Sequence, residues 1–586
     1  MAEYTRIGEA GSSHRPDVGD EYNNVDRHDS FEHEDLPLHE QELDEKHLAT
    51  IAEDGDLSDP DSDSELDDIL DVEKQNRPLQ GEQEQERPRS RLMPKWKQYK
   101  TYGSLVKSWC IVALPRFCQP GGLRLKKEPY PTAWLDALRG YAAWIVFQYH
   151  CFNTYDPSWR RQPFVSVLFA GPGMVALFFV ISGYVLSYGL LKHMRTRQSS
   201  GMLDSLASAT FRRYMRLYAS SVVATMFAFV LVRLHLYNGR GLWVPTFFGQ
   251  VRDWLWNTIF FINPLGDVRG WYHEGTQNSN YEGALWTIPV EFRGSMILFG
   301  FCAAVCKLRT PWRMGLTWLI IVLCYLWNTV YVAEFLYGMF VADLSLLRNP
   351  DRVRRPGAPL PPLPTSHAPV ESAGLAAAAP HTRTGSLRKW SWRNWSGNWS
   401  LVNRKEDNNR KRNHHQSGRL PRILKNIGYM LLFLLGIFLL GQPDGTDLGV
   451  WGQFPWQFLK SFIPIWYTDG AEYYFYLSMG AFCLLLALDS LPFLQRPLMC
   501  GFSQYVGDLS FGIYALHPPL TWAFYIGFAD PMRAKYLGDS PLAYIPGYIS
   551  MTLLVFTAAD YFTRLDKKIV RLGRWIQVKL FRKWGC

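Results

Sequence analysis

Apolar segments alternate with shorter polar segments along most of the chain after residue 132. An α-helix needs about 20 mostly apolar residues to cross the hydrocarbon core of a bilayer. The ten segments of this kind, of which the sixth is short, cover residues 133–154, 171–191, 215–236, 284–306, 314–332, 333–347, 423–441, 471–489, 507–527 and 541–563. The pattern predicts an all-α polytopic membrane protein with about ten transmembrane helices. The apolar stretch at 251–264 is expected to form an interfacial or re-entrant helix instead.

The polar segments differ in composition and divide the chain into regions. Residues 1–92 are acidic and contain too few apolar side chains to form a core, which predicts a disordered cytosolic N-terminus. Residues 93–131 are basic and aromatic, and their longest apolar run is too short to span a bilayer, so we expect a juxtamembrane helix on its surface. The transmembrane domain then covers 132–563, with a low-complexity insert at 348–422 that is also expected to be disordered and cytosolic. Residues 564–586 form a basic cytosolic tail.

The chain has 62 Lys and Arg against 53 Asp and Glu, a formal net charge of +9. Such a charge can indicate a nucleic-acid partner, but here the basic residues flank apolar segments, where they fix the orientation in a bilayer. We therefore expect a lipid bilayer and no nucleic acid among the partners. Basic residues concentrate in 192–214, 348–422 and the tail after Phe562, so the positive-inside rule predicts that both termini are cytosolic. Endoplasmic reticulum, Golgi and plasma membrane all fit this topology.

The nine cysteines are scattered along the chain and form no CxxC pair. This spacing predicts neither a disulfide framework nor a metal site. The N-terminal segment lacks the apolar core of a signal peptide, so membrane insertion is expected to depend on the first transmembrane helix. We expect no metal and no permanently bound cofactor.

Ionisable side chains within the predicted transmembrane helices are candidates for function, because burying them in hydrocarbon is costly. The first helix contains Asp136, Arg139 and His150. Arg139 and His150 are eleven residues apart, so they share one face of the helix at about 16 Å separation along its axis. Asp136 lies one turn before Arg139 and could pair with it. From these residues alone, His150 is either a functional group or a histidine that ends a helix at the membrane interface.

Five motifs, in order along the chain, resemble signature motifs of the acyltransferase-3 family of membrane-bound O-acyltransferases. They are RGYAAWIVFQYH (139–150), LFFVISGYV (177–185), FRRYMRLY (211–218), ALWTIPVEF (284–292) and GDLSFGIYALHPPL (507–520). The sequence departs from the family pattern at Ala219, where a proline often follows the third motif. The long acidic N-terminus is similar to that of fungal members.

The resemblance implies transfer of an acyl group, commonly acetyl, from acyl-CoA as co-substrate to a hydroxyl of a small metabolite, lipid or glycan. An alcohol is a poor nucleophile at neutral pH, and a neutral imidazole is well suited to accept its proton. His150 is therefore the expected general base. Glu291 is expected to orient that imidazole or to hold the acceptor, and the alternative is an ion pair with Arg293 or with another helix. Arg139 is expected to neutralise the pyrophosphate of the donor or to polarise the thioester carbonyl.

Arg213 and Arg216 of the third motif are expected to bind the phosphates of CoA, because guanidinium groups suit phosphate oxygens. The alternative is that arginines here only anchor the helix at the cytosolic surface, which we prefer for Arg212. His517 is followed by Pro518 and Pro519, so it is expected to lie where the ninth helix breaks, with a structural role.

A transporter or flippase for a lipid-like metabolite is the competing function. Polar side chains in the middle of a helix bundle serve binding sites and proton relays in such proteins too. Transporters often contain inverted repeats, and the two halves of this sequence show no repeat. The sequence does not identify the acceptor or the length of the acyl chain.

Overall fold

A computed structural model describes residues 113–125, 130–152, 158–237, 241–264, 279–353, 419–442, 454–467 and 471–584. The structure in these ranges is helical, and the β-type pairing found within them is a single bridge between Ser279 and Glu282. The predicted N-terminal region 1–92, most of the juxtamembrane segment and most of the insert at 348–422 lie outside the described residues.

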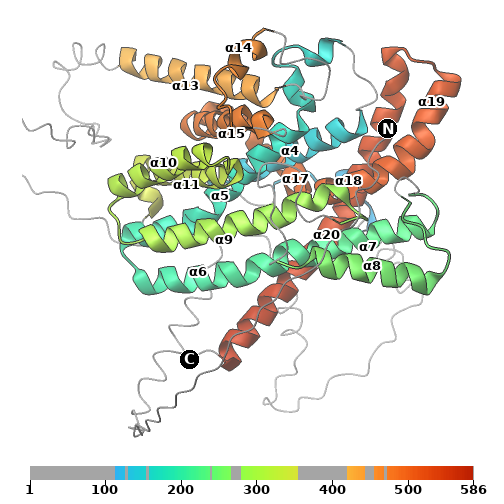
Figure 1. Cartoon of the computed structure of the whole chain (residues 1–586), viewed down its shortest axis with the longest axis horizontal. Helices are drawn as coiled ribbons and strands as arrows, with labels where there is room; N and C mark the ends of the chain where they lie inside the picture. The colour runs from blue at the N-terminus through green and yellow to red at the C-terminus, as the bar shows by residue number, and fades with distance from the viewer. Residues whose placement is uncertain are drawn as a thin grey trace, which may run out of the picture. The chain divides into compact units, whose positions relative to one another are not determined.

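Helices form at all ten positions where the sequence predicts a transmembrane segment (Figure 1). The main helices are α4 (Trp134–Cys151), α5 (Gly171–Thr196), α6 (Ser199–Tyr214), α7 (Ser220–Arg233), α8 (Phe247–Phe261), α9 (Thr287–Val305), α10 (Thr310–Leu326), α11 (Val330–Arg348), α13 (Arg419–Leu440), α15 (Ala471–Ser490), α17 (Gly501–Asp508), α18 (Ser510–Leu520), α19 (Asp530–Tyr536) and α20 (Ile545–Trp584). Most of them run side by side in one bundle (Figure 1).

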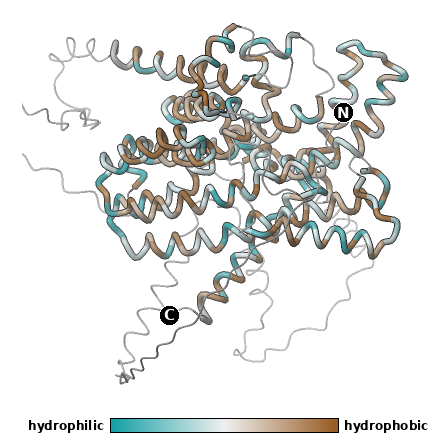
Figure 2. The backbone as a smooth tube through the Cα atoms, in the orientation of Figure 1, coloured by the Kyte–Doolittle hydropathy of each residue, from teal (hydrophilic) through white to brown (hydrophobic). Residues whose placement is uncertain are grey.

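Seven helical segments of the described chain are long and apolar enough to cross a membrane. They are Gly171–Thr196, Ser199–Arg233, Gly283–Val305, Val330–Arg348, Ile423–Leu440, Glu472–Ser490 and Pro541–Phe581. The helices at the other three predicted positions are shorter or more polar: α4 carries Asp136, Arg139 and His150, and α10 is 17 residues long. Several helices expose large apolar side chains, for example Leu431 and Leu435 of α13, as expected of a surface that faces lipid. Figure 2 shows hydrophobic residues along the helices of the bundle.

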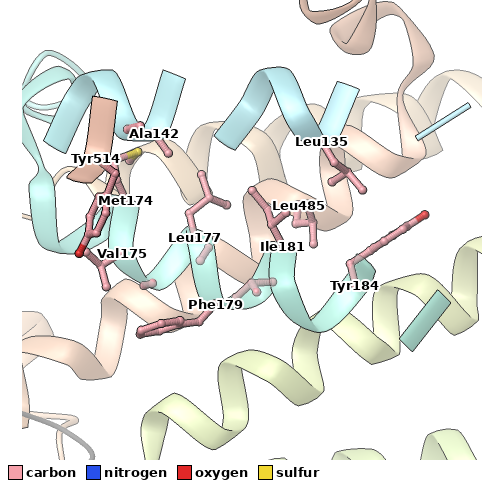
Figure 3. Close-up of a cluster of buried hydrophobic side chains, with 14 of the residues drawn as sticks. Leu135, Ala142, Met174, Val175, Leu177, Phe179, Ile181, Tyr184, Leu485 and Tyr514 are labelled. Atoms are coloured by element: carbon pink, nitrogen blue, oxygen red, sulfur yellow. The ribbon is translucent and has the colours of Figure 1, made fainter. Parts of the chain in front are cut away.

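Helix α5 lies at the centre of the core and packs closely against α11. A Cβ atom built at Gly183 would lie 2.1 Å from the carbonyl oxygen of Phe335, and one at Gly338 would lie 2.0 Å from that of Val180. Residues without a side chain let helix backbones approach this closely. Figure 3 shows Leu177 of α5 within the surrounding cluster of buried apolar side chains, which also draws on α4, α15 and α18.

A buried carboxylate ties three helices together at one end of the bundle. Asp343 of α11 accepts hydrogen bonds from Arg195 of α5 at 2.6 Å and from Arg313 of α10 at 2.8 Å. Asp343 and Arg313 are almost completely buried, at 2% and 1% exposure. The polar atoms of a buried ion pair must be hydrogen-bonded, because the free-energy cost of removing the charges from water otherwise exceeds their mutual attraction.

Helices α6 and α7 are joined without a turn by a π-helical segment, η4 (Met215–Ala219). Together they form one helical stretch from Ser199 to Arg233. Ala219 is the last residue of η4. The proline that the family pattern often has at this position would end or bend the helix. Alanine keeps its N–H, so the chain continues as a helix at this point.

The C-terminal helix is anchored by residues from the segment that precedes the first transmembrane helix. Arg116 binds Asp560 of α20 at 2.6 Å and Asp508 of α17 at 2.5 Å. The Tyr561 hydroxyl donates to the carbonyl oxygen of Ala113 at 2.6 Å. The basic region 564–586 begins as a continuation of α20, which runs without interruption to Trp584.

Candidate active site

The first polar group of the bundle centres on Glu291, in the first turns of α9. Arg213, at the end of α6, donates to its Oε1 atom at 2.7 Å, and the Ser182 hydroxyl of α5 donates to the same oxygen at 2.9 Å. Arg213 also donates to the Ser295 hydroxyl at 2.9 Å. The side chains of Arg213 and Glu291 are 10% and 15% exposed. Glu291 therefore forms an ion pair with another helix, the alternative that the sequence left open, and its partner is Arg213.

Arg139 and Arg216 complete this group from two sides. Arg139 of α4 is close enough for its charge to act on Glu291, and both arginines act on Asp136. The Arg139 Nε atom is buried and has no hydrogen-bond partner in the described part of the chain. Asp136 also accepts a hydrogen bond from the hydroxyl of Tyr130. Arg139 thus interacts with Asp136 through its charge, and part of its guanidinium remains without a hydrogen bond.

The two arginines of the RxxR motif differ in their surroundings. Arg213 is held inside the bundle, whereas Arg216 is exposed. Arg216 lies in the π-helical segment η4, whose wider turn changes the angle between successive side chains. Both arginines were expected to bind phosphate, but Arg216 is the exposed residue of the two, whereas Arg213 is paired with Glu291.

The second polar group consists of two histidines. The rings of His150 and His517 lie 5.2 Å apart between centroids, and their planes are tilted by 30°. His150 is in the last turn of α4 and is exposed, whereas His517 of α18 is completely buried. Arg139 and His150 lie near opposite ends of α4, and the ring of His517 lies beside that of His150.

Two hydroxyls join α9 and α18, the helices that carry Glu291 and His517. The Tyr514 hydroxyl lies 2.7 Å from the Thr287 hydroxyl and donates to the carbonyl oxygen of Ala284 at 2.5 Å. Tyr514 precedes His517 by three residues on α18, and Thr287 precedes Glu291 by four on α9, so each pair shares one face of its helix. The sequence motifs did not single out Tyr514 or Thr287, because the contacts of these residues depend on which helices pack together.

The break expected after His517 does not occur. Helix α18 continues through Pro518 and Pro519 to Leu520 and is followed by a second π-helical segment, η10 (Thr521–Ala529). A proline removes one backbone N–H and its ring collides with the preceding turn, so the helix must widen or bend to continue. Here the chain widens, and His517 stays inside an intact helix.

The described residues include no group of three or more His, Cys, Asp or Glu side chains that could hold a metal ion. The charged and ionisable side chains of the two polar groups belong to arginine, aspartate, glutamate and histidine. A cluster of cations suits an anionic ligand, and an exposed imidazole suits proton transfer.

Comparisons with known proteins identify the family of the chain. The chain matches a family model described as an acyltransferase domain, Acyl_transf_3, over residues 132–563. It is 27% identical over 536 residues to the O-acetyltransferase PaAT-1 of Phomopsis amygdali, a match that covers 85% of this chain and 94% of that protein. It is also 24% identical to the acyltransferase R4 of a Phoma species and 22% identical to the acyltransferase clz18 of Cochliobolus lunatus. These two matches cover 30% and 28% of this chain, and 49% and 48% of the relatives.

No solved structure matches the chain. The family match covers the whole region from the first to the last predicted transmembrane helix. It gives the transporter alternative no support. The chain therefore belongs to the acyltransferase-3 family, and it is a multi-pass membrane acyltransferase.

Proposed function

We propose that this acyltransferase transfers an acyl group, commonly acetyl, from acyl-CoA to a hydroxyl of a small metabolite, lipid or glycan. The observation that carries the proposal is that two different polar groups lie along α4. Arginines surround Arg139 near one end of the helix, and His150 lies at the other end. The first group suits the phosphates of the donor, and the second suits an uncharged alcohol. The name of the relative PaAT-1, an O-acetyltransferase, supports both the acetyl group and the oxygen acceptor.

On the donor side, Arg216 and Arg139 bind the phosphates of acyl-CoA. Arg216 is exposed, and Arg139 has a buried Nε atom without a hydrogen-bond partner in the described structure. Both can offer N–H groups to phosphate oxygens. Arg213 was an equal candidate, but it already donates to Glu291 and Ser295, so it contributes its charge and holds the site together.

On the acceptor side, His150 is the general base. Its exposed side chain can be reached by a hydroxyl group. The imidazole takes the hydroxyl proton while the alcohol oxygen attacks the thioester carbonyl carbon. The carbon–sulfur bond then breaks, and the thiolate of CoA takes the proton from His150. The products are the ester and CoA, and the protein returns to its starting state.

The proposed topology has ten transmembrane helices with both termini in the cytosol. In this orientation Arg139 lies toward the cytosolic donor and His150 toward the opposite side. The basic segments that the positive-inside rule identifies support this orientation. The donor thioester then extends along α4 for about 16 Å, the rise of eleven helical residues. The acceptor reaches His150 from the far side or from within the membrane.

The test is the mass of the product formed by purified protein with isotope-labelled acetyl-CoA and a panel of alcohols, sugars and lipids. The expected product is an ester that carries the label on an acceptor oxygen. A label on nitrogen, or an acyl donor other than CoA, would refute the proposal. N-linked glycan at Asn394 or Asn398, both in N-x-S sequons of the loop expected to be cytosolic, would refute the topology.

A further inference from the structure

His517 lies in a completely buried position next to the ring of the expected base, His150. The other rings around it belong to Phe147 and Tyr514, whose centroids lie 6.5 and 6.0 Å away. A histidine enclosed in this way has a defined set of hydrogen bonds, and these determine which of its nitrogens carries a proton.

The proton of His517 lies on Nδ1. This atom is 2.8 Å from the carbonyl oxygen of Tyr514 and 3.2 Å from that of Ile513. A carbonyl oxygen only accepts hydrogen bonds, so Nδ1 must be the donor. In the neutral imidazole the other nitrogen, Nε2, is then an acceptor with an available lone pair.

The residue after His517 explains why this carbonyl oxygen is available. In a regular α-helix, the oxygen of Tyr514 would accept from the N–H four residues later, which is the position of Pro518. Proline has no N–H, so it cannot make this bond. The imidazole of His517 takes its place, and Pro518 thereby helps to fix the tautomer of its neighbour.

The Nε2 atom of His517 is buried and has no hydrogen-bond partner within the described residues. Buried polar atoms are nearly always satisfied, so an exception needs an explanation. The nearest ring that can offer an N–H is that of His150, at 5.2 Å between centroids. His150 is exposed, and a change of its side-chain rotamer would bring an N–H toward Nε2.

We propose that His517 is a positioning residue whose Nε2 atom accepts a hydrogen bond from His150 during acyl transfer. This rests on the proposed role of His150 as base. The bond turns the second nitrogen of His150 toward the acceptor hydroxyl and stabilises the imidazolium that forms when it takes the proton. That proton passes to the thiolate of CoA, and His517 neither gains nor loses one.

Two variants of matched polarity test the proposal. His517→Gln places a side-chain amide near the position of Nε2, and His517→Asn places it near Nδ1. We expect the Asn variant to lose about 10- to 100-fold in kcat, with little change in KM for acyl-CoA, and the Gln variant to keep most of the activity. Equal kcat values in the two variants, whether high or low, would overturn the proposal. Thermal unfolding in detergent establishes that both variants are folded.

Pro518→Ala provides a second test that keeps His517 in place. The restored N–H at position 518 competes with the Nδ1–H of His517 for the carbonyl oxygen of Tyr514. The imidazole of His517 is then no longer held in the tautomer with its proton on Nδ1. We expect a lower kcat in a protein that is at least as stable, and an unchanged kcat would count against the proposal. The activity of His150→Ala distinguishes failure of the proposed function from failure of the inference about His517. If His150→Ala is fully active, His150 is not the base. If it is inactive while both His517 variants are fully active, only the inference about His517 fails.

Discussion

Arg213 and Glu291 form an ion pair of 2.7 Å between α6 and α9, and the hydroxyl of Ser182 donates to the same carboxylate oxygen at 2.9 Å. The sequence suggested separate roles for the two charged residues, one for the donor and one for the acceptor. Their pairing means that a change at either one leaves an unbalanced charge inside the bundle. Loss of stability must therefore be separated from loss of chemistry before a catalytic role is assigned to either.

We expect Glu291→Gln to destabilise the protein by up to about 3–5 kcal/mol, because it leaves the charge of Arg213 without its partner. Thermal unfolding in detergent measures the loss. The double variant Arg213→Met with Glu291→Leu should recover part of the stability, since neither charge remains. A Glu291→Gln variant that is as stable as the wild type but inactive would contradict this view and indicate a direct catalytic role.

We expect Arg216→Gln to raise KM for acyl-CoA by about tenfold or more without lowering stability, because its exposed guanidinium loses charge-assisted hydrogen bonds to phosphate. Steady-state kinetics at two salt concentrations measure the effect. Arg212→Gln is the matched control, since the Arg212 Nε atom donates to the carbonyl oxygen of Ser208 in its own helix at 3.4 Å. Equal effects of both substitutions would mean that the region attracts the donor only through its net charge.

We expect His150→Ala to lower kcat by about 10²- to 10⁴-fold, the usual contribution of a general base. Abundance and membrane insertion should not change, because the side chain is exposed at the end of α4. Acyl transfer by purified protein, normalised to folded protein, measures the effect. Full activity of this variant would remove His150 from the mechanism.

We expect Gly183→Ala to destabilise the bundle by about 1–3 kcal/mol or more, because the new methyl group would collide with the backbone of α11. Gly189→Ala is the control on the same helix, since no atom lies within 4 Å of the added Cβ there. The control should be neutral or slightly stabilising. A similar unfolding temperature for both variants would show that α5 and α11 can separate at no cost.

Hydropathy located the helices of this protein well, because the cost of exposing a backbone to lipid constrains every segment that crosses it. Helices form at the ten predicted positions, and seven helical segments meet the requirements of length and apolar composition. The prediction was less accurate where one residue alters the backbone. Pro518 and Pro519 suggested a break, yet the chain continues into the π-helical segment η10.

The site was predicted in part. A helical repeat is local, so the sequence placed Arg139 and His150 on one helix and at its opposite ends. The partner of Glu291 depends on the packing of α5, α6 and α9, which local patterns do not contain. The difference between Arg213 and Arg216 depends on a π-helical turn that no residue in the motif signals.

Helix α20 has 40 residues and is therefore about 60 Å long, twice the hydrocarbon thickness of a bilayer. Its last part packs on α6, where Gln577 donates to Ser208 at 2.8 Å and the rings of Phe581 and Phe211 lie 5.6 Å apart. In a thicker or thinner membrane, the lipid boundary would move along α20 while these protein contacts stay in place. The end of α6 that carries Arg213 is thus supported by contacts with another helix as well as by the lipid around it.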